Sequence, residues 1–257
     1  MNRSAIAFLL YHEIAIPGRE LCEIEPGYVR YVLDAPRFEA QMRTIKEAGL
    51  RGVSVTRALE FPTHAVGITF DDGCETDLLA AAPILKELDF GATFYVTSGR
   101  VGQNGYMSAA QLREICGLGF EIGCHSMTHP FLTDLDRDGL RREIVEAKDQ
   151  LEHFIGQPIR HFSCPGGRYD GRVIEMARGA GYRTLATSIP RTNSPGTDRY
   201  ALGRVAITRG IKAHAFQRFC RGEVTWTFTL GARLRDRAKR VLGNAAYVRL
   251  RAILLGR

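Results

Sequence analysis

Short apolar segments alternate along most of this chain with amphipathic segments of helical length. The apolar segments are rich in β-branched and aromatic residues, and roughly ten to fifteen residues separate one from the next. This alternation predicts βαβ units, in which consecutive strands lie parallel and the connecting helices cover the sheet. Roughly seven or eight units favour an α/β fold with a distorted or incomplete parallel (β/α) barrel. An open doubly wound sheet is the alternative, but no glycine-rich dinucleotide-binding turn opens a helix.

The expected elements follow from this alternation. We expect strands over residues 5–11, 52–55, 65–70, 91–96, 120–124, 159–164 and 182–187, with a last strand near 203–207. We expect helices over residues 36–49, 75–90, 108–119, 137–154 and 171–181, with a last helix near 213–220. The loop over residues 13–35 is long for a compact domain, which is typical of a lid or a substrate loop.

The net charge of +7 is concentrated at one end of the chain. Residues 231–257 hold eight Lys or Arg and one Asp, which leaves 27 residues of each sign in the rest. A nucleic-acid-binding protein would carry its basic residues differently, so we expect no nucleic-acid partner. We therefore expect a barrel domain over residues 1–223 and a basic amphipathic helical tail over 224–257. The tail either packs on the barrel with a solvated basic side or makes peripheral contact with an anionic membrane.

The location of the protein is predicted from two absences. No apolar run reaches the length that spans a bilayer, and the first residues show no signal-peptide cleavage pattern, so we expect a cytoplasmic protein.

The cysteines form no C-x-x-C pair, and free buried thiols are expected instead of disulfides or a thiolate metal site. There are six of them: Cys22, Cys74, Cys116, Cys124, Cys164 and Cys220.

Two adjacent carboxylates end the apolar segment VGITFDDG. Like charges side by side at the end of a buried strand repel each other and resist desolvation, so Asp71 and Asp72 require a compensating cation. The segment HSMTHP supplies His125 and His129, four residues apart and directly after another expected strand. One carboxylate with two imidazoles suits a divalent metal, with Zn²⁺ the best match to this donor set.

Two further segments occupy the same structural position. His12 follows the first expected strand, and Pro165, Gly166, Gly167 and Arg168 follow the strand over residues 159–164. In a parallel barrel the carboxyl ends of the strands meet at one face, where active sites are built. The sequence therefore predicts that these four segments converge on a single site.

The motifs TFDDG and HSMTHP resemble the first two signature motifs of the polysaccharide deacetylases, carbohydrate esterase family 4. The resemblance extends through LLYHEI, GATFYVTSG, FSCPGGRYD and AGYRTL and covers roughly residues 5–210. It implies a distorted (β/α) barrel that hydrolyses the N-acetyl groups of amino sugars. It also implies that Asp72, His125 and His129 are the metal ligands and that Asp71 is the general base.

The resemblance assigns further roles around this site. The loop of Pro165, Gly166, Gly167 and Arg168 is expected to contact substrate and to stabilise an oxyanion with its backbone N–H groups. Tyr11-His12 looks like the Tyr-His pair of the exopolysaccharide deacetylase branch. This likeness implies that His12 is the general acid that protonates the leaving amine, with Tyr11 beside the substrate.

Three departures from the family pattern are visible. The third motif usually carries an Arg before its Pro, where this chain has Ser163-Cys164, so Arg168 or Arg204 is expected to steady the base. The Asp-x-Trp of the fourth motif is absent. The Leu-x-His of the fifth motif is absent too, and the nearest histidine, His214, lies in an expected helix.

These observations predict a metal-dependent hydrolase that deacetylates an N-acetylated oligosaccharide, polysaccharide or lipid-linked sugar. The same metal site could instead serve another C–N bond, in a ureido or cyclic amide substrate. A non-catalytic carbohydrate-binding relative is the other alternative, against which the retained Asp71 argues because a binding protein needs no base.

Overall fold

Eight strands form one parallel sheet in the computed structural model, which describes residues 5–224. The order along the sheet is β10-β1-β5-β6-β7-β8-β9, and β4 pairs in addition with β5. The strands are β1 (Phe8–Tyr11), β4 (Arg51–Val53), β5 (Ala65–Phe70), β6 (Thr93–Val96), β7 (Glu121–Cys124), β8 (His161–Ser163), β9 (Thr184–Ala186) and β10 (Val205–Ala206). The expected parallel α/β architecture is confirmed.

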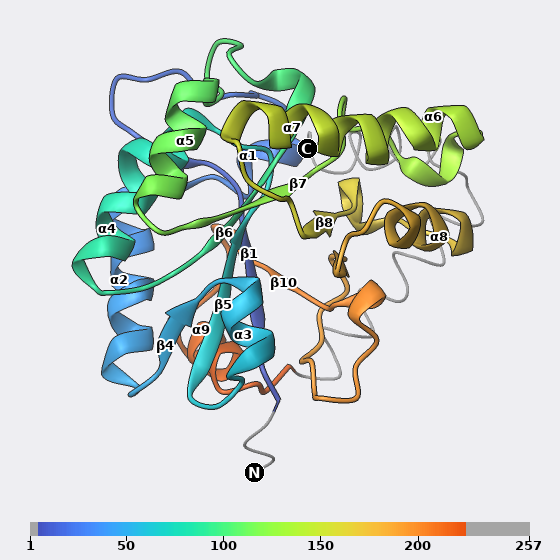
Figure 1. Cartoon of the computed structure of the whole chain (residues 1–257). Helices are drawn as coiled ribbons and strands as arrows, with labels where there is room; N and C mark the ends of the chain where they lie inside the picture. The colour runs from blue at the N-terminus through green and yellow to red at the C-terminus, as the bar shows by residue number, and fades with distance from the viewer. Residues whose placement is uncertain (1–4, 225–257) are drawn as a thin grey trace.

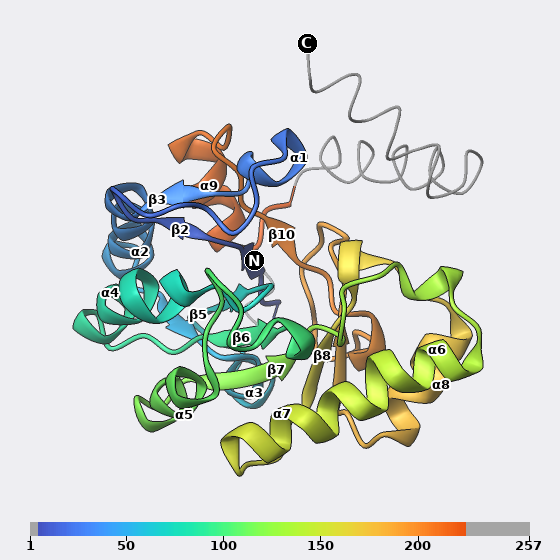
Figure 2. The same ribbon diagram turned by 90° about the horizontal axis from the view of Figure 1, so that it is seen from above.

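The barrel is distorted at two places. β4 and β6 share one edge of β5, because Gly67 of β5 pairs with Val53 while Thr69 pairs further along with Thr93. Between β9 and β10 the ring closes through the chain at Leu202, whose carbonyl accepts the Thr187 N–H at 2.8 Å. Figure 2 shows the strands from above, with helices around them.

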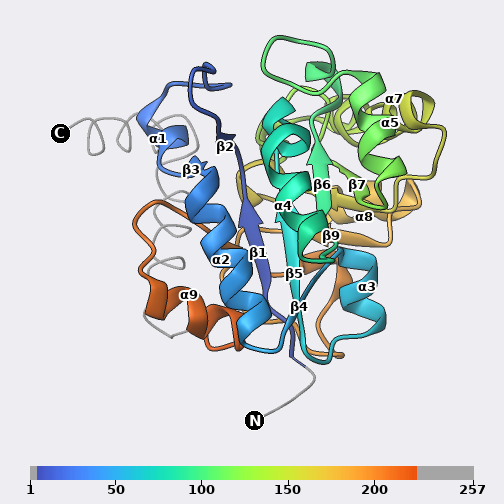
Figure 3. The ribbon, with the colours of Figure 1, turned by 90° about the vertical axis from the view of Figure 1, so that its left-hand side faces the viewer.

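The helices cover the outside of the sheet. Figures 1 and 3 show α2 and α4 lying against β1 and β5. The helices are α2 (Ala35–Glu47), α3 (Val55–Glu60), α4 (Ala82–Glu87), α5 (Ala109–Gly117), α6 (Arg137–Arg141), α7 (Ala147–Ile155), α8 (Gly171–Gly179) and α9 (Ala213–Cys220). The loop after β1 holds two short paired strands, β2 (Ile14–Ala15) and β3 (Leu33–Asp34), and the single turn α1 (Pro26–Val29).

Local chemistry sets several of these boundaries. The strand expected over residues 52–55 ends at Val53, because the Ser54 side chain accepts the Arg57 N–H and begins α3. The helices expected over 75–90 and 137–154 each contain a π-helical turn, η1 (Asp77–Ala81) before α4 and η4 (Arg142–Glu146) between α6 and α7. Such turns often mark functional positions, and both of these lie near the site described below.

A row of aromatic side chains packs the strands against the helices. The ring of Phe70 in β5 stacks on Phe94 in β6 at 4.8 Å and meets Phe38 of α2 at 5.6 Å. Each fully buried side chain of this kind contributes about 1.5–3 kcal/mol to folding. Because Phe70 faces these helices, its neighbours Thr69 and Asp71 face the inside of the barrel, as expected from the alternation of side chains along a strand.

Other expectations concern the cysteines and the tail. The six cysteines are free, as expected, but only four are buried, because Cys22 and Cys116 are half-buried. Among residues 5–224 no helix is both long enough and apolar enough to cross a membrane. The basic tail expected over 224–257 lies, beyond Val224, outside the described residues, so its helical structure and its membrane contact stay predictions.

Candidate active site

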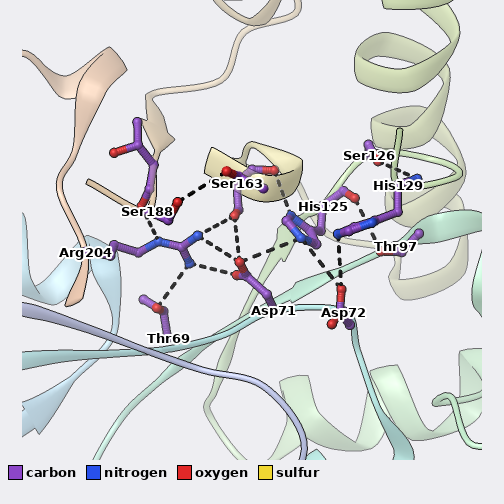
Figure 4. Close-up of polar contacts among 12 residues, drawn as sticks. Thr69, Asp71, Asp72, Thr97, His125, Ser126, His129, Ser163, Ser188 and Arg204 are labelled. Atoms are coloured by element: carbon purple, nitrogen blue, oxygen red, sulfur yellow. Dashed lines mark hydrogen bonds and ion pairs between the residues drawn. The ribbon is translucent and has the colours of Figure 1, made fainter. Parts of the chain in front are cut away.

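The ends of β5 and β7 bring the two predicted motifs together (Figure 4). Asp71 and Asp72 follow β5, and His125 follows β7, which is separated from β5 only by β6. Asp72 has φ +82°, in the left-handed region that Asp tolerates better than most residues. The chain therefore turns sharply at Asp72, and the two neighbouring carboxylates point toward different partners.

Asp72, His125 and His129 form a cluster with the geometry of a metal site. Asp72 Oδ1 lies 3.5 Å from His129 Nε2 and 3.7 Å from His125 Nε2. Ligands about 2.0–2.1 Å from one tetrahedral ion stand about 3.3 Å from each other, so these donors need little movement to bind one. Asp72 Oδ1 is buried and has no hydrogen-bond partner among residues 5–224. A bound cation would supply the partner that such a buried oxygen lacks.

The imidazole of His125 is prepared as a ligand. Its Nδ1–H donates to the Ser163 carbonyl at 2.8 Å, which leaves the lone pair of Nε2 directed toward Asp72. Burial lowers the pKa of His125 to about 3, so the ring is neutral at ordinary pH. A neutral ring is required for coordination, and the residues present therefore fit a divalent metal.

Glu143 holds the loop that carries His129. Its carboxylate accepts the N–H groups of Met127 and Thr128 at 2.9 and 2.8 Å and the Thr128 hydroxyl at 2.7 Å. Two residues of this loop, Ser126 and His129, have φ near +65°, a conformation that costs energy unless the surroundings impose it. No local sequence signal marks Glu143 as functional, because it lies in η4, far along the chain from the loop that it holds.

Arg204 is the arginine that steadies Asp71. Its guanidinium binds both carboxylate oxygens, at 2.7 and 2.8 Å, and donates to the Ser163 hydroxyl at 2.7 Å. It is 1% exposed and lies inside the barrel (Figure 4). Of the two arginines considered as replacements, Arg168 instead lies over the Phe131 ring at 4.0 Å. Ser163, which with Cys164 stands where the family pattern carries its arginine, contributes a hydroxyl to the same network.

The environments of the two carboxylates move their pKa values apart. Burial alone would raise the pKa of Asp71, but the charge and hydrogen bonds of Arg204 hold it well below its ordinary value. Burial raises the pKa of Asp72 to about 6, and the charge of Asp71 adds to this effect. Asp71 is thus ionised over a wide pH range, while Asp72 is the carboxylate that a cation would stabilise.

His12 follows β1 on the same face of the barrel. Its ring packs against Tyr31 at 4.7 Å between centroids, and its Nδ1 has no hydrogen-bond partner within the described part of the chain. Burial lowers the pKa of His12, and the charges of Asp72 and Asp71 partly oppose this effect. The alternative histidine, His214, is exposed on α9. The role of His12 as the general acid stays a prediction.

The structure corrects the role expected for Tyr11. Its side chain is fully buried and stacks on Phe70, with 5.4 Å between the ring centroids. Its hydroxyl donates to Oε1 of Gln41, a residue of α2, at 2.9 Å. Neighbouring residues of a strand point to opposite faces, so Tyr11 faces the helix layer when His12 faces the site. Tyr11 is a packing residue here and does not reach a substrate.

Replacing Tyr11 by Phe should therefore affect stability and not turnover. We expect a loss of about 0.5–1.5 kcal/mol in the free energy of unfolding, because one buried hydrogen bond is removed. Urea denaturation and steady-state kinetics measure the two quantities. A tenfold fall in kcat with unchanged stability would instead indicate that Tyr11 contributes to the site.

The loop of residues 165–167 is a tight turn after β8. A Cβ at Gly167, which has φ +69°, would lie 2.0 Å from Ser188 Oγ, so only glycine fits. The N–H groups of Gly167 and Arg168 donate back to Cys164 and Pro165 within the turn. Of the three N–H groups in this turn, that of Gly166 is therefore the one that would stabilise an oxyanion. This role of the loop stays a prediction.

The fold and the cluster together define a class of protein: a parallel (β/α) barrel with one carboxylate and two imidazoles at the carboxyl ends of its strands, beside a second carboxylate held by arginine. The sequence profile described as polysaccharide deacetylase matches residues 58–185, which include all four motif residues after β5 and β7. The chain belongs to the polysaccharide deacetylase family, carbohydrate esterase family 4.

Individual relatives agree with this assignment. YxkH of Bacillus subtilis is 27% identical over 186 residues, 70% of this chain and 67% of that protein. Peptidoglycan-N-acetylglucosamine deacetylase of Bacillus cereus is 32% identical over 124 residues, so the match spans 48% of this chain and little more than half, 56%, of that relative. The structure of the Streptococcus pyogenes deacetylase PplD, at 24% identity, superposes with a TM-score of 0.74 over 85% of this chain and 99% of that one, which shows the shared fold.

Proposed function

We propose that this protein is a metal-dependent hydrolase that removes N-acetyl groups from an amino sugar in an oligosaccharide, a polysaccharide or a lipid-linked intermediate. The observation that carries the proposal is the cluster of Asp72, His125 and His129 beside an Asp71 that Arg204 keeps ionised. Support also comes from relatives named as N-deacetylases, among them the poly-beta-1,6-N-acetyl-D-glucosamine N-deacetylase of Staphylococcus aureus, 22% identical over 74% of this chain and 72% of that protein.

The residues divide the chemistry between them. Asp72, His125 and His129 would hold the metal, for which the donor set favours Zn²⁺. When bound, a divalent metal polarises a carbonyl oxygen and makes water more acidic. Asp71 accepts the proton of the water that attacks the acetamide carbon. Because its pKa is low, Asp71 is a weak base, and a weak base is sufficient for a water molecule that a divalent metal would make more acidic. Arg204 and Ser163 fix the orientation of the Asp71 carboxylate.

The remaining steps concern the oxyanion and the leaving group. The N–H of Gly166 would donate to the oxygen that gains charge when water adds to the carbonyl. His12 then gives a proton to the amine nitrogen as the C–N bond breaks. Acetate and the free amino sugar leave, Asp71 releases its proton to solvent, and His12 takes up a proton from solvent, which restores the site.

This role of His12 predicts a distinctive pH profile. A general acid must carry its proton, and burial lowers the pKa of His12 from its ordinary value of 6.5. We therefore expect kcat to fall with rising pH from a point below 6.5, since the protonated fraction declines there. His12→Gln should lower kcat by roughly 10²–10⁴-fold and abolish this fall. A variant with wild-type kcat and an unchanged profile would exclude His12 as the acid.

The proposal itself is tested by acetate release. The zinc-loaded protein is incubated with N-acetylglucosamine oligomers and with lipid-linked N-acetylated sugars, and acetate is measured against the same protein after chelation. Acetate from either substrate, lost on chelation and regained with zinc, supports the proposal. Release only from ureido or cyclic amide compounds would point to the related hydrolase. Binding of the oligomers without turnover of any of these would point to a carbohydrate-binding protein.

A further inference from the structure

A second group of metal-ligating side chains lies outside the site already described. It consists of Glu13, from the chain just after β1, Cys22, from the loop between β2 and α1, and Cys74, which follows Gly73 after β5. One carboxylate oxygen and the two Sγ atoms all lie within 4.8 Å of one another. Glu13 and Cys74 are buried and Cys22 is half-buried, so the group is not a chance meeting of exposed residues.

Surrounding hydrogen bonds hold these three side chains in place. The Glu13 carboxylate accepts the Cys22 N–H at 3.0 Å and the Tyr28 hydroxyl at 3.0 Å. The same Tyr28 oxygen lies 3.4 Å from Cys74 Sγ, and Cys22 Sγ lies 3.1 Å from the Gly105 carbonyl. Metal ligands are commonly oriented by outer hydrogen bonds of this kind, which fix the ligand atoms before the ion binds.

Within residues 5–224 neither the Glu13 carboxylate nor that of Asp77, which follows in the chain after Cys74, has a positively charged partner. Asp77, in the first turn of η1, is 0% exposed, and neither of its carboxylate oxygens has a hydrogen-bond partner within residues 5–224. Its backbone N–H donates to the Cys74 carbonyl at 3.0 Å, which places the Asp77 backbone beside that of Cys74. Buried carboxylates without positively charged partners are costly, and a cation would remove the cost.

We propose that Cys22, Cys74 and Glu13 bind a second divalent metal, of the zinc class. Two thiolates select zinc and similar borderline metals over magnesium or calcium. Binding releases the two thiol protons to solvent. The ion ties the loop of Cys22 to the strand end that carries Asp72, and so has a structural role. The sequence held no C-x-x-C signal for it, because three separate segments supply the ligands.

The test counts metal ions and identifies their ligands. The full-length protein is purified with zinc under reducing conditions, and zinc per chain is measured by mass spectrometry. We expect two ions per chain in the wild type and in the control Cys116→Ser, whose half-buried thiol lies elsewhere. We expect one ion in Cys22→Ser/Cys74→Ser, which keeps the histidine site. We also expect one ion in His125→Ala, which keeps the thiolate site, so failure of one site is distinguishable from failure of the other.

Cobalt substitution gives a spectroscopic readout that is independent of the metal count. Thiolate ligands produce a sulfur-to-cobalt charge-transfer absorption in the near ultraviolet, which Asp72, His125 and His129 cannot give. We expect this absorption in the wild type and in Cys116→Ser and its loss in the double cysteine variant. A wild type that binds one ion per chain without this absorption overturns the proposal. So does a Cys22–Cys74 disulfide that persists in reductant, because it would consume both ligands.

Discussion

Replacing Asp71 by Asn is expected to lower kcat by roughly 10²–10⁴-fold while the metal content of the histidine site stays at its wild-type level. The amide cannot accept the proton of the attacking water, whereas Asp72, His125 and His129 are untouched. Asp72→Asn should instead lose both metal and turnover, because Asp72 Oδ1 is the atom that both imidazoles approach. Two adjacent residues of the same type thus have separable functions. Acetate release and metal analysis on the same preparations measure both effects.

Two results would contradict this division. If Asp71→Asn retained most of its turnover, the base would have to be another residue. If it lost its metal, Asp71 would be a ligand, a reading that its 3.7 Å distance to His125 Nε2 makes worth testing. Zinc titration of Asp71→Asn against the wild type separates weak binding from absent binding, and the double variant Asp71→Asn/Asp72→Asn gives the background for both assays.

Replacing Arg204 by Ala is expected to destabilise the protein by about 3–5 kcal/mol, since it leaves Asp71 buried beside no counter-charge. We also expect a large loss of kcat, because the carboxylate then loses its orientation and becomes protonated more easily. Arg168→Ala is the matched control. It removes a cation from the face of the Phe131 ring, for which about 0.5–1 kcal/mol is expected. Urea denaturation and acetate release measure both variants, and equal stability losses in the two would refute the assignment of Arg204.

The pH dependence of stability provides an independent check. In the wild type the pKa of Asp71 is lower in the folded protein than in the unfolded chain, where it is about 3.8. The ion pair of Asp71 with Arg204 therefore stabilises the fold above that pH, and this contribution is lost as the pH falls. In Arg204→Ala burial should raise that pKa, so stability should decrease as the pH rises through the new value. The sign of the slope therefore reverses. A further variant, Asp71→Leu/Arg204→Met, should regain stability without regaining activity, because it removes both buried charges.

Much of the metal cluster could be predicted from local sequence, because each ligand lies in the segment that follows an apolar strand. Parallel strands bring such positions together whatever the details of packing. Arg204 could not be distinguished from Arg168 in this way. Its contact with Asp71 spans 133 residues and depends on where the barrel closes. The likeness places Tyr11 beside the substrate, whereas its buried side chain packs toward α2, as the alternation of side chains along β1 favours. Glu143 gave no signal, because a carboxylate on an amphipathic helix is ordinary.

The closure of the barrel through Leu202 has a consequence for how this protein reaches its working state. The ligands for the ion lie no further along the chain than its midpoint and leave the ribosome early, whereas Arg204 emerges among the last parts of the sheet. A nascent or truncated chain that stops before that point could gather its imidazoles around a cation and still hold Asp71 without its partner. Only chains that have been synthesised through the final strand are therefore competent for hydrolysis.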